Sequence, residues 1–511
     1  MHAEASHKKS MVPLAEALGS HGHDVTIWKS FFVKQPVKLS HAIDYDVVIP
    51  TSSQIYNEQF VWKNGTELIN PWIAPPLSSY DLIMPWWLNI DTCRHTIDHA
   101  TDELEKLTRD HQWDLIIMDL FFAPCAYVII EKARAAALEA SLPPPQYILM
   151  STSFFLHFSL IDYGLPMPIS SAKPMGHNFE VARFWDRMKY VVNWRIMEPV
   201  VMKIVNFLIN YHLTPALSSS FDLSAHNRDA TFIYSVYPPS LDSAFPLTRT
   251  ALNFGDVDCD KVFGRPDPLP SDLEQFVSDP ASKGTILAAF GHMISWKGAP
   301  NSTIDAFHDA FKELKNYHIV WQYNGRPLPP LPNVRIMTWI PQPALLGHPR
   351  TKVFISHMGL KSCIEAACNR LPVAALPIFA EQGYNTLQMV DKKHCGEDFD
   401  KFSLSKGYIL KKLQKLLDNP DDSYKSAIQK LALYMGDKIR PDLDVGVFWT
   451  EFAWRNRDRM HLLRDRSKSL NFAKYAMLDV IGFLAVLTLI ASYIIIKAIS
   501  VLIQFNSNVN G

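Results

Sequence analysis

The sequence predicts an α/β protein with two parallel-sheet domains and one membrane-spanning helix. In the C-terminal half, apolar runs typical of buried strands alternate with helical segments, which indicates a parallel sheet with helices on both faces. The N-terminal half shows a less regular version of this pattern. Near the C-terminus, residues 480–496 are uncharged and mostly apolar, and with the apolar run that follows they reach the length that a bilayer core needs.

The elements of the N-terminal half follow from local patterns. Helices are expected near residues 9–19, 92–109, 124–140 and 184–209. Strands are expected at residues 25–28, 114–118, 147–150 and 231–236. A Pro- and Asp-rich stretch that ends near residue 270 is the natural linker to the second domain.

The C-terminal half repeats strand and helix more cleanly. Strands are expected at residues 285–290, 317–321, 334–338, 353–356 and 373–378, with helices near 303–315 and 361–368. His357 and Glu381-Gln382 follow two of these strands, and a helix begins directly after His357. Open parallel sheets bind ligands at the carboxyl ends of their strands, and a helix N-terminus there suits a phosphate. The pattern therefore predicts a nucleotide-diphosphate site.

Composition excludes several other classes of protein. The chain has 511 residues and a net charge of -1, so nothing in its charge favours nucleic acid as a partner. Its six cysteines lack the paired spacing of a zinc site or of a disulfide scaffold. One or two disulfides are left open, because spacing does not assign them.

The side chains around the predicted site have expected roles. His357 would donate to a phosphate, Glu365 would accept from ribose hydroxyls, and Trp339 would stack on a base. Glu381 and Gln382 would bond to sugar hydroxyls. The alternative is a buried α/β core with a few satisfied polar residues, which is the commoner role for a lone histidine.

Residues 339–385 resemble the signature segment of the UDP-glycosyltransferases, the animal UDP-glucuronosyltransferases in particular. They are similar to the motifs W-x-P-Q-x-x-L-L-x-H-P, H-G-G-x-x-x-x-x-E-A and D-Q of that family. The resemblance implies the GT-B architecture, in which two Rossmann-like domains face a cleft, with a UDP-sugar donor, a small lipophilic acceptor, no cofactor and no metal ion. It places the donor site at Gly291, His292, Trp339, Gln342, His357, Gly359, Lys361, Ser362, Glu365, Glu381 and Gln382.

The resemblance also divides the chain. The expected parts are an acceptor-binding domain (1–255), a UDP-sugar-binding domain (256–440), a segment that crosses back and approaches the membrane (441–475), the transmembrane helix (476–504) and a short tail (505–511). Residues 1–6 show neither a signal peptide nor the family's first strand, which indicates that both are missing; a naturally short form is the alternative. A missing first strand would leave a central position of the N-terminal sheet unfilled.

His7 and Asp119 are the expected catalytic pair. Residues 7–26 resemble the family's opening helix and second strand, and the resemblance makes His7 the base that takes the acceptor's hydroxyl proton. Asp119 would orient the imidazole. The alternatives are an exposed loop histidine at position 7 and an Asp119 that caps the following helix. The aromatic residues expected to line the acceptor site, with plain core as their alternative, are Trp86, Trp87, Phe154, Phe155 and Phe158.

Four residues of the donor site depart from the family pattern. Met358 replaces the second residue of His-Gly-Gly, where its bulk is expected to meet the phosphate and to disfavour a positive φ. Lys361 replaces Asn, and its charge can bind the diphosphate. His292 replaces Ser or Thr, and Glu381 replaces Asp. Together these four changes point to an altered sugar preference or a loss of activity. The choice of sugar stays open, because glucuronate, glucose and others share these motifs.

The expected function is inverting, metal-independent transfer of a glucuronosyl or glucosyl group to a hydroxyl. The expected location is the endoplasmic reticulum membrane, spanned once, with the body in the lumen. Two sequons, at Asn64 and Asn301, agree with that orientation, whereas the basic residues before the span favour the opposite one. The alternative function is a non-catalytic homologue that binds nucleotides or lipophiles or associates with active transferases. Self-association is left open.

Overall fold

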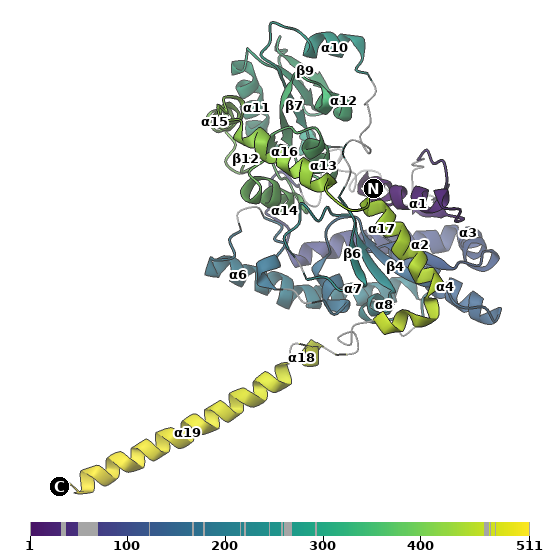
Figure 1. Ribbon diagram of the computed structural model, residues 1–511, viewed down its shortest axis with the longest axis vertical. Helices are drawn as coiled ribbons and strands as arrows, with labels where there is room; N and C mark the ends of the chain where they lie inside the picture. Colours follow the sequence, from purple (N-terminus) through teal and green to yellow (C-terminus); the bar gives the residue numbers. More distant parts are fainter. Residues whose placement is uncertain are drawn as a thin grey trace.

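The computed structural model shows a two-domain body from which one long helix extends (Figure 1). It describes residues 2–31, 37–49, 70–121, 123–165, 168–176, 179–214, 216–218, 221–244, 246–256, 259, 268–291, 294–463, 470, 472–475 and 477–509. Sequence positions His292 and Asn64 lie outside these residues, so the expectations for them stay predictions.

The C-terminal domain is built on a parallel sheet with the strand order β12-β11-β10-β7-β8-β9. The strands are β7 (Thr285–Ala289), β8 (His318–Gln322), β9 (Val334–Met337), β10 (Thr351–Ser356), β11 (Val373–Ala375) and β12 (Gly396–Asp398). The chain starts at β7, adds β8 and β9 on one side, and then crosses to add β10, β11 and β12 on the other. The strand order therefore reverses between β7 and β10, and such a switch point is where open α/β sheets form their binding crevice.

Helices cover both faces of this sheet, as the alternating pattern predicts. One face packs against α11 (Asn301–Glu313) and α15 (Lys406–Leu417). The other face packs against α10 (Ser271–Val277), α12 (Gln342–Gly347), α13 (Leu360–Cys368), α14 (Gln382–Thr386), η7 (Leu387–Lys392) and α16 (Ser423–Gly436). Strands such as β7 are fully buried, because a sheet covered on both faces exposes neither set of side chains.

The N-terminal domain contains two separate parallel sheets. One has the order β3-β4-β5-β6 and the other pairs β1 with β2. The strands are β1 (Thr26–Phe31), β2 (Ile43–Val48), β3 (Leu115–Asp119), β4 (Gln146–Ser151), β5 (Phe232–Ser235) and β6 (Ala251–Asn253). A cavity of about 730 Å³ lies between the sheets, lined by β1, β3, α1 (His2–Ser20) and α4 (Pro124–Glu139). No backbone hydrogen bonds of the described strands join the two sheets.

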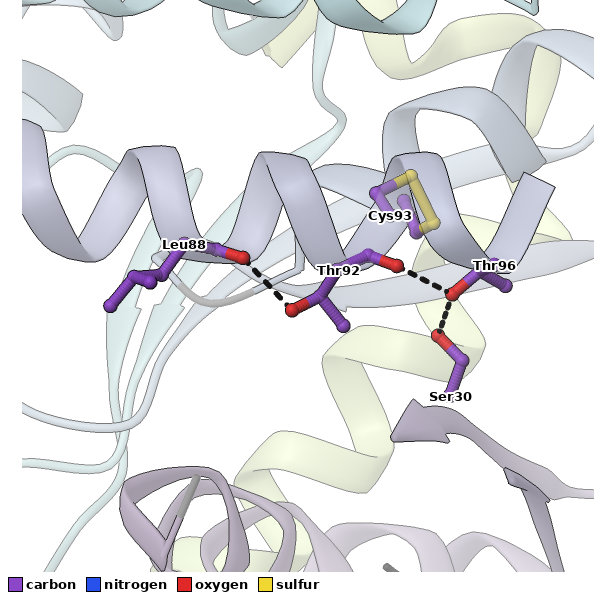
Figure 2. The surroundings of a disulfide bond; sticks show 6 residues. Ser30, Leu88, Thr92, Cys93 and Thr96 are labelled. Atoms are coloured by element: carbon purple, nitrogen blue, oxygen red, sulfur yellow. Dashed lines mark hydrogen bonds between the residues drawn. A yellow bond between two sulfur atoms is a disulfide. The ribbon is translucent and has the colours of Figure 1, made fainter. Parts of the chain in front are cut away.

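Helices and one disulfide connect the two N-terminal sheets. Cys93 of α2 (Ile83–His99) is bonded to Cys125 of α4, and the Thr96 hydroxyl lies 2.8 Å from that of Ser30 at β1 (Figure 2). The helix expected near 92–109 is thus wrong in its start, since α2 begins at Ile83 and is followed by α3 (Thr101–Glu105) and η3 (Lys106–Asp110). The remaining helices around this domain are η2 (Ser79–Leu82), α5 (His157–Asp162), η4 (Ile169–Ser171), α6 (Phe184–Tyr190), η5 (Val191–Met197), α7 (Glu198–Leu213) and α8 (Leu223–Asp229).

The chain returns to the N-terminal domain after the second sheet, as the sequence predicts. Helix α17 (Asp442–Arg455) packs against α1, and Val447 joins the buried cluster that contains Leu14. After η8 (Arg457–Leu463) and α18 (Phe472–Tyr475), the chain forms α19 (Leu478–Val509). Residues 478–504 of α19, whose most apolar 18-residue window has a mean hydropathy of 2.4, make a helix long and apolar enough to cross a membrane. A long apolar helix near the predicted position is thus confirmed, as a candidate for the membrane span.

The predicted aromatic lining is mostly wrong. Trp86, Phe154, Phe155 and Phe158 are no more than 3% exposed and pack in the hydrophobic clusters of the body. Their alternative role as core residues is the one that the structure shows. Trp87 alone of the five is partly exposed.

Candidate functional site

The switch point of the C-terminal sheet gathers the predicted donor residues. Ala289 at the end of β7 is paired with Ser356 at the end of β10, so the chain that follows each strand leaves the sheet at the same place. Gly291 follows the first strand, and His357 follows the second. The sheet thus brings together two residues that are 66 positions apart in the sequence.

The His357 ring lies between two glycines. A Cβ atom at Gly291 would lie 3.0 Å from the ring, and one at Gly359 would lie 2.7 Å from Nε2, so neither position accepts a side chain without displacing the imidazole. Gly291 also has a φ of +66°, which favours glycine. Because α13 begins at Leu360, His357 is held directly beside the N-terminus of that helix.

Met358 adopts the positive φ that its side chain was expected to disfavour. Its φ is 65°, and its side chain is fully buried in the domain core rather than directed at the helix N-terminus. The main chain is held by hydrogen bonds: its N–H donates to Ser356 Oγ at 3.0 Å, and its carbonyl accepts from Asn385 Nδ2 at 2.8 Å. The expectation that Met358 adds bulk at the phosphate is therefore wrong, because packing energy in the core offsets the backbone strain.

Gln342, Ser362 and Glu365 form one hydrogen-bonded group on α12 and α13. Gln342 Nε2 donates to Glu365 Oε2 at 2.5 Å and lies 3.5 Å from Ser362 Oγ. Burial raises the pKa of Glu365, while its bond from Gln342 opposes the rise. Trp339 shortly precedes Gln342 in the sequence and is 70% exposed. A planar group can therefore stack on its ring.

Lys361 lies in the first turn of α13 and is reached by solvent. Burial by the surrounding protein and the charge of nearby Lys9 of α1 nevertheless lower its pKa to about 8, and Glu365 opposes the shift. A cation in the first turn of a helix is unfavourable in itself, as are two adjacent cations. Lys9 and Lys361 come from different domains, so an anion bound at the start of α13 would relieve repulsion between them.

Glu381 and Gln382 lie where the chain enters α14. Gln382 Oε1 accepts from the N–H groups of Ile378 and Phe379, at 2.9 and 3.0 Å, so this side chain shapes the loop after β11. Burial raises the pKa of Glu381, and the nearby His7 opposes that rise. His7 of the first domain therefore lies within electrostatic reach of the donor loop of the second.

His7 and Asp119 form the predicted pair. His7 Nδ1 lies 2.6 Å from Asp119 Oδ2, and their side chains are 23% and 9% exposed. Asp119 Oδ1 also accepts from the N–H of Phe121 at 2.8 Å, so the aspartate stabilises the turn after β3 as well. The loop alternative for His7 is excluded, because the residue lies in α1. Thr152, which follows β4, also bonds to Nδ1 and was missed; its only signal in the sequence is its place just after a strand.

Comparison with known proteins settles the family. A family model described as "UDP-glucoronosyl and UDP-glucosyl transferase" matches residues 226–510. The chain belongs to this family. As a UDP-glycosyltransferase it carries the donor motifs at the switch point described above, and the predicted resemblance is confirmed.

Individual relatives of this UDP-glycosyltransferase include animal enzymes. A UDP-glucuronosyltransferase of Pleuronectes platessa is 35% identical over 50% of this chain, and the match spans 53% of that protein, about half its length. UDP-glycosyltransferase UGT5 of Dactylopius coccus is 24% identical, with 98% of this chain and 90% of that protein covered. UDP-glucuronosyltransferase 1A6 of Oryctolagus cuniculus is 25% identical, with 97% and 89% covered.

Solved structures confirm the GT-B fold. The structure of Phytolacca americana UGT2 complexed with UDP-2fluoro-glucose and pterostilbene has a TM-score of 0.55 at 15% identity, with 88% of this chain and 97% of that chain covered. The structure of Os79 from O. sativa in complex with UDP has a TM-score of 0.53 at 13% identity, with 87% and 96% covered. At these identities the likeness concerns the fold, which is two parallel-sheet domains around a cleft.

The two domains of this UDP-glycosyltransferase are joined at α14 by residues that sequence reasoning missed. Asn385 links the domains, since it accepts from Tyr237 Oη at 2.8 Å and donates to the carbonyl of Met358. Tyr384 donates to Asp242 Oδ1 at 2.5 Å, and Asp242 forms a buried ion pair with Lys173. No local pattern marks these residues, because their partners lie in the other domain.

Proposed function

We propose that this protein transfers a glucuronosyl or glucosyl group from a UDP-sugar to the hydroxyl of a small lipophilic acceptor. The observation that carries the proposal is the His7–Asp119 pair, at 2.6 Å, together with the effect of His7 on the pKa of Glu381 in the other domain. His7 is the expected base, and Glu381 lies in the loop expected to hold the donor sugar. A base in one domain must lie beside the sugar in the other for direct transfer to occur.

His7 acts as the general base. Asp119 and Thr152 both contact Nδ1, and this fixes the ring so that Nε2 receives the proton. The acceptor oxygen loses its proton to Nε2 and bonds to the anomeric carbon. The bond from that carbon to the β-phosphate oxygen breaks at the same time, UDP leaves with the electron pair, and the configuration inverts. Asp119 stabilises the imidazolium that forms.

The start of α13 holds the diphosphate. Its free N–H groups and dipole favour an anion, and His357 and Lys361 add donors at the same place. Trp339 stacks on the base, Glu365 accepts from the ribose, and Glu381 and Gln382 contact the sugar hydroxyls. Transfer is expected to proceed without a metal ion and to survive a chelator.

Substitution of His7 tests the mechanism. A general base contributes about 10²–10⁴-fold to rate, so His7→Ala should lower acceptor-dependent UDP release by that factor while UDP binding, followed by calorimetry, is unchanged. His21→Ala is the matched control, since His21 lies just beyond the same helix with a side chain that is 52% exposed. Unchanged transfer in His7→Ala would refute the base. Intact UDP binding with no transfer in the unaltered chain would favour the non-catalytic alternative.

We further propose that the body lies in the lumen of the endoplasmic reticulum. Two disulfides, Cys93–Cys125 and Cys259–Cys368, suit an oxidising compartment, and Asn301 is exposed at the start of α11, where a glycan can attach. In sealed microsomes the body should resist added protease, and an endoglycosidase should increase its mobility. Digestion of the body in intact microsomes would place it in the cytosol instead.

A further inference from the structure

The helix formed by α6, η5 and α7 is apolar on two opposite faces. Its inner face packs in the core of the N-terminal domain through Trp194, Val201, Val205 and Ile209. Its outer face also carries large apolar side chains, each at least 40% exposed: Phe184, Trp185, Met188, Val192, Ile196, Met197, Val200, Ile204, Phe207 and Tyr211. A surface helix normally places polar residues on this side, so a helix with two apolar faces is expected to be covered on both of them.

The outer residues form one continuous face. From Trp185 to Tyr211 they recur every three or four positions, with Met197 as an addition beside Ile196, and this is the spacing of neighbours along one side of a helix. The backbone stays helical where α6 meets η5 and where η5 meets α7. Thirty helical residues span about 45 Å, so the outer face is a long apolar stripe rather than scattered surface residues.

Aromatic and basic residues border this outer face. Phe184 and Trp185 lie at one end, and Phe207 and Tyr211 at the other. Four basic residues lie on the same helix, Arg187, Lys189, Arg195 and Lys203, and Arg183 directly precedes it. Aromatic rings favour the interface between lipid and water, and basic residues favour anionic headgroups, so this composition is typical of helices that lie in the plane of a membrane.

The chain's own membrane span holds the body near a bilayer. Leu463 still packs against the body, and α19 begins at Leu478, so the 14 residues between them limit the separation to about 50 Å. In Figure 1, α6, α7 and α8 lie along the edge of the N-terminal domain that is nearest to α18 and α19. These helices thus lie on the side of the body from which α19 leaves.

We propose that the outer face of α6, η5 and α7 lies on the surface of the bilayer that α19 spans. Burial of apolar surface away from water is favourable, and the outer face offers ten large apolar side chains, each at least 40% exposed. The tether removes most of the entropic cost of a second contact with the same membrane. The body therefore rests on the membrane through two attachments, and its N-terminal domain contacts the lipid.

Fluorescence quenching by lipids tests the contact in the full-length chain. A bimane label on Phe207→Cys reports on the outer face, and the same label on Leu433→Cys is the matched control, since Leu433 is 60% exposed on α16 of the other domain. The free thiols Cys363 and Cys395 are buried, so labelling of the folded chain is confined to the introduced cysteines. The protein is reconstituted into phosphatidylcholine and phosphatidylserine vesicles that contain nitroxide-labelled lipid.

The expected result is that the label at position 207 loses most of its fluorescence, whereas the label at 433 does not. The position 207 thiol should also react slowly with a water-soluble reagent in vesicles and rapidly in dilute detergent. An unquenched and freely reactive position 207 would overturn the proposal. A position that is protected but unquenched would also overturn it, and would assign the face to a protein contact, such as a second copy of the chain.

Discussion

At the residue scale, Lys361 shows how one departure from the family pattern changes the site. The family usually has Asn at this position, and here a lysine with a pKa of about 8 lies at the N-terminus of α13. Its charge attracts a diphosphate only while the amine is protonated. Below pH 8 the lysine is charged, and as pH rises through 8 the charge is lost in the free protein.

Donor affinity should therefore weaken on the alkaline side of pH 8. The KM for the UDP-sugar is expected to rise several-fold between pH 7 and pH 9.5, with a smaller change in kcat. Lys361→Asn should show a higher KM at pH 7 and little further rise, because it has no proton to lose there. The same rise in KM in both proteins would show that another group controls binding. Measurement of KM against pH at fixed acceptor concentration distinguishes these results.

At the element scale, the turn from β10 to α13 shows why a local rule can fail. Sequence reasoning expected glycine-like flexibility at position 358 and treated Met358 as an obstacle. A positive φ costs a residue with a side chain about 1–2 kcal/mol, whereas emptying a buried methionine site costs about 2–5 kcal/mol. The second effect is larger, and the side chain is fully buried.

Restoring the family's glycine should therefore harm the protein. Met358→Gly is expected to lower the free energy of unfolding by about 1–3 kcal/mol, the difference between the two effects, and to leave UDP affinity unchanged as long as the chain is folded. Met358→Leu, which keeps the buried volume, should cost less than about 1.5 kcal/mol. Denaturant titration and calorimetry measure the two quantities. A more stable or more tightly binding Met358→Gly would show that the side chain does obstruct the site.

Local sequence patterns predicted the strands that carry the site residues better than they predicted the strands and contacts around the site. Apolar runs before His357 and Asp119 marked β10 and β3, because a buried strand followed by a polar residue is a local signal. Strand β2 (Ile43–Val48) was missed, since its two aspartates and half-exposed pattern hide it. Thr152, Lys9 and Asn385 were missed for a different reason: each gains its role from a partner that is far away in the sequence.

At the scale of the whole molecule, a buried charge joins the two domains beside the donor loop. Lys173 is 1% exposed, forms an ion pair with Asp242, and lies 5.2 to 5.9 Å from the centres of the Phe154, Tyr237 and Tyr384 rings. Burial lowers the pKa of Lys173, and Asp242 opposes this. Tyr384, which belongs to the donor domain, donates to the same aspartate, so the ion pair fixes α14 against the first domain.

Breaking this pair should loosen the cleft. Lys173→Met leaves the Asp242 carboxylate buried without its cation, which costs about 3–5 kcal/mol, and the freed donor loop should raise the KM for the UDP-sugar more than it lowers kcat. Lys173→Met with Asp242→Leu should recover much of the stability, because no charge stays buried, but not the KM. Arg326→Met is the control, since its ion pair with Asp305 is exposed and contributes little. Equal losses in Lys173→Met and Arg326→Met would show that the buried pair does not couple the domains, whereas recovery of KM in the double variant would show that the pair acts on stability alone.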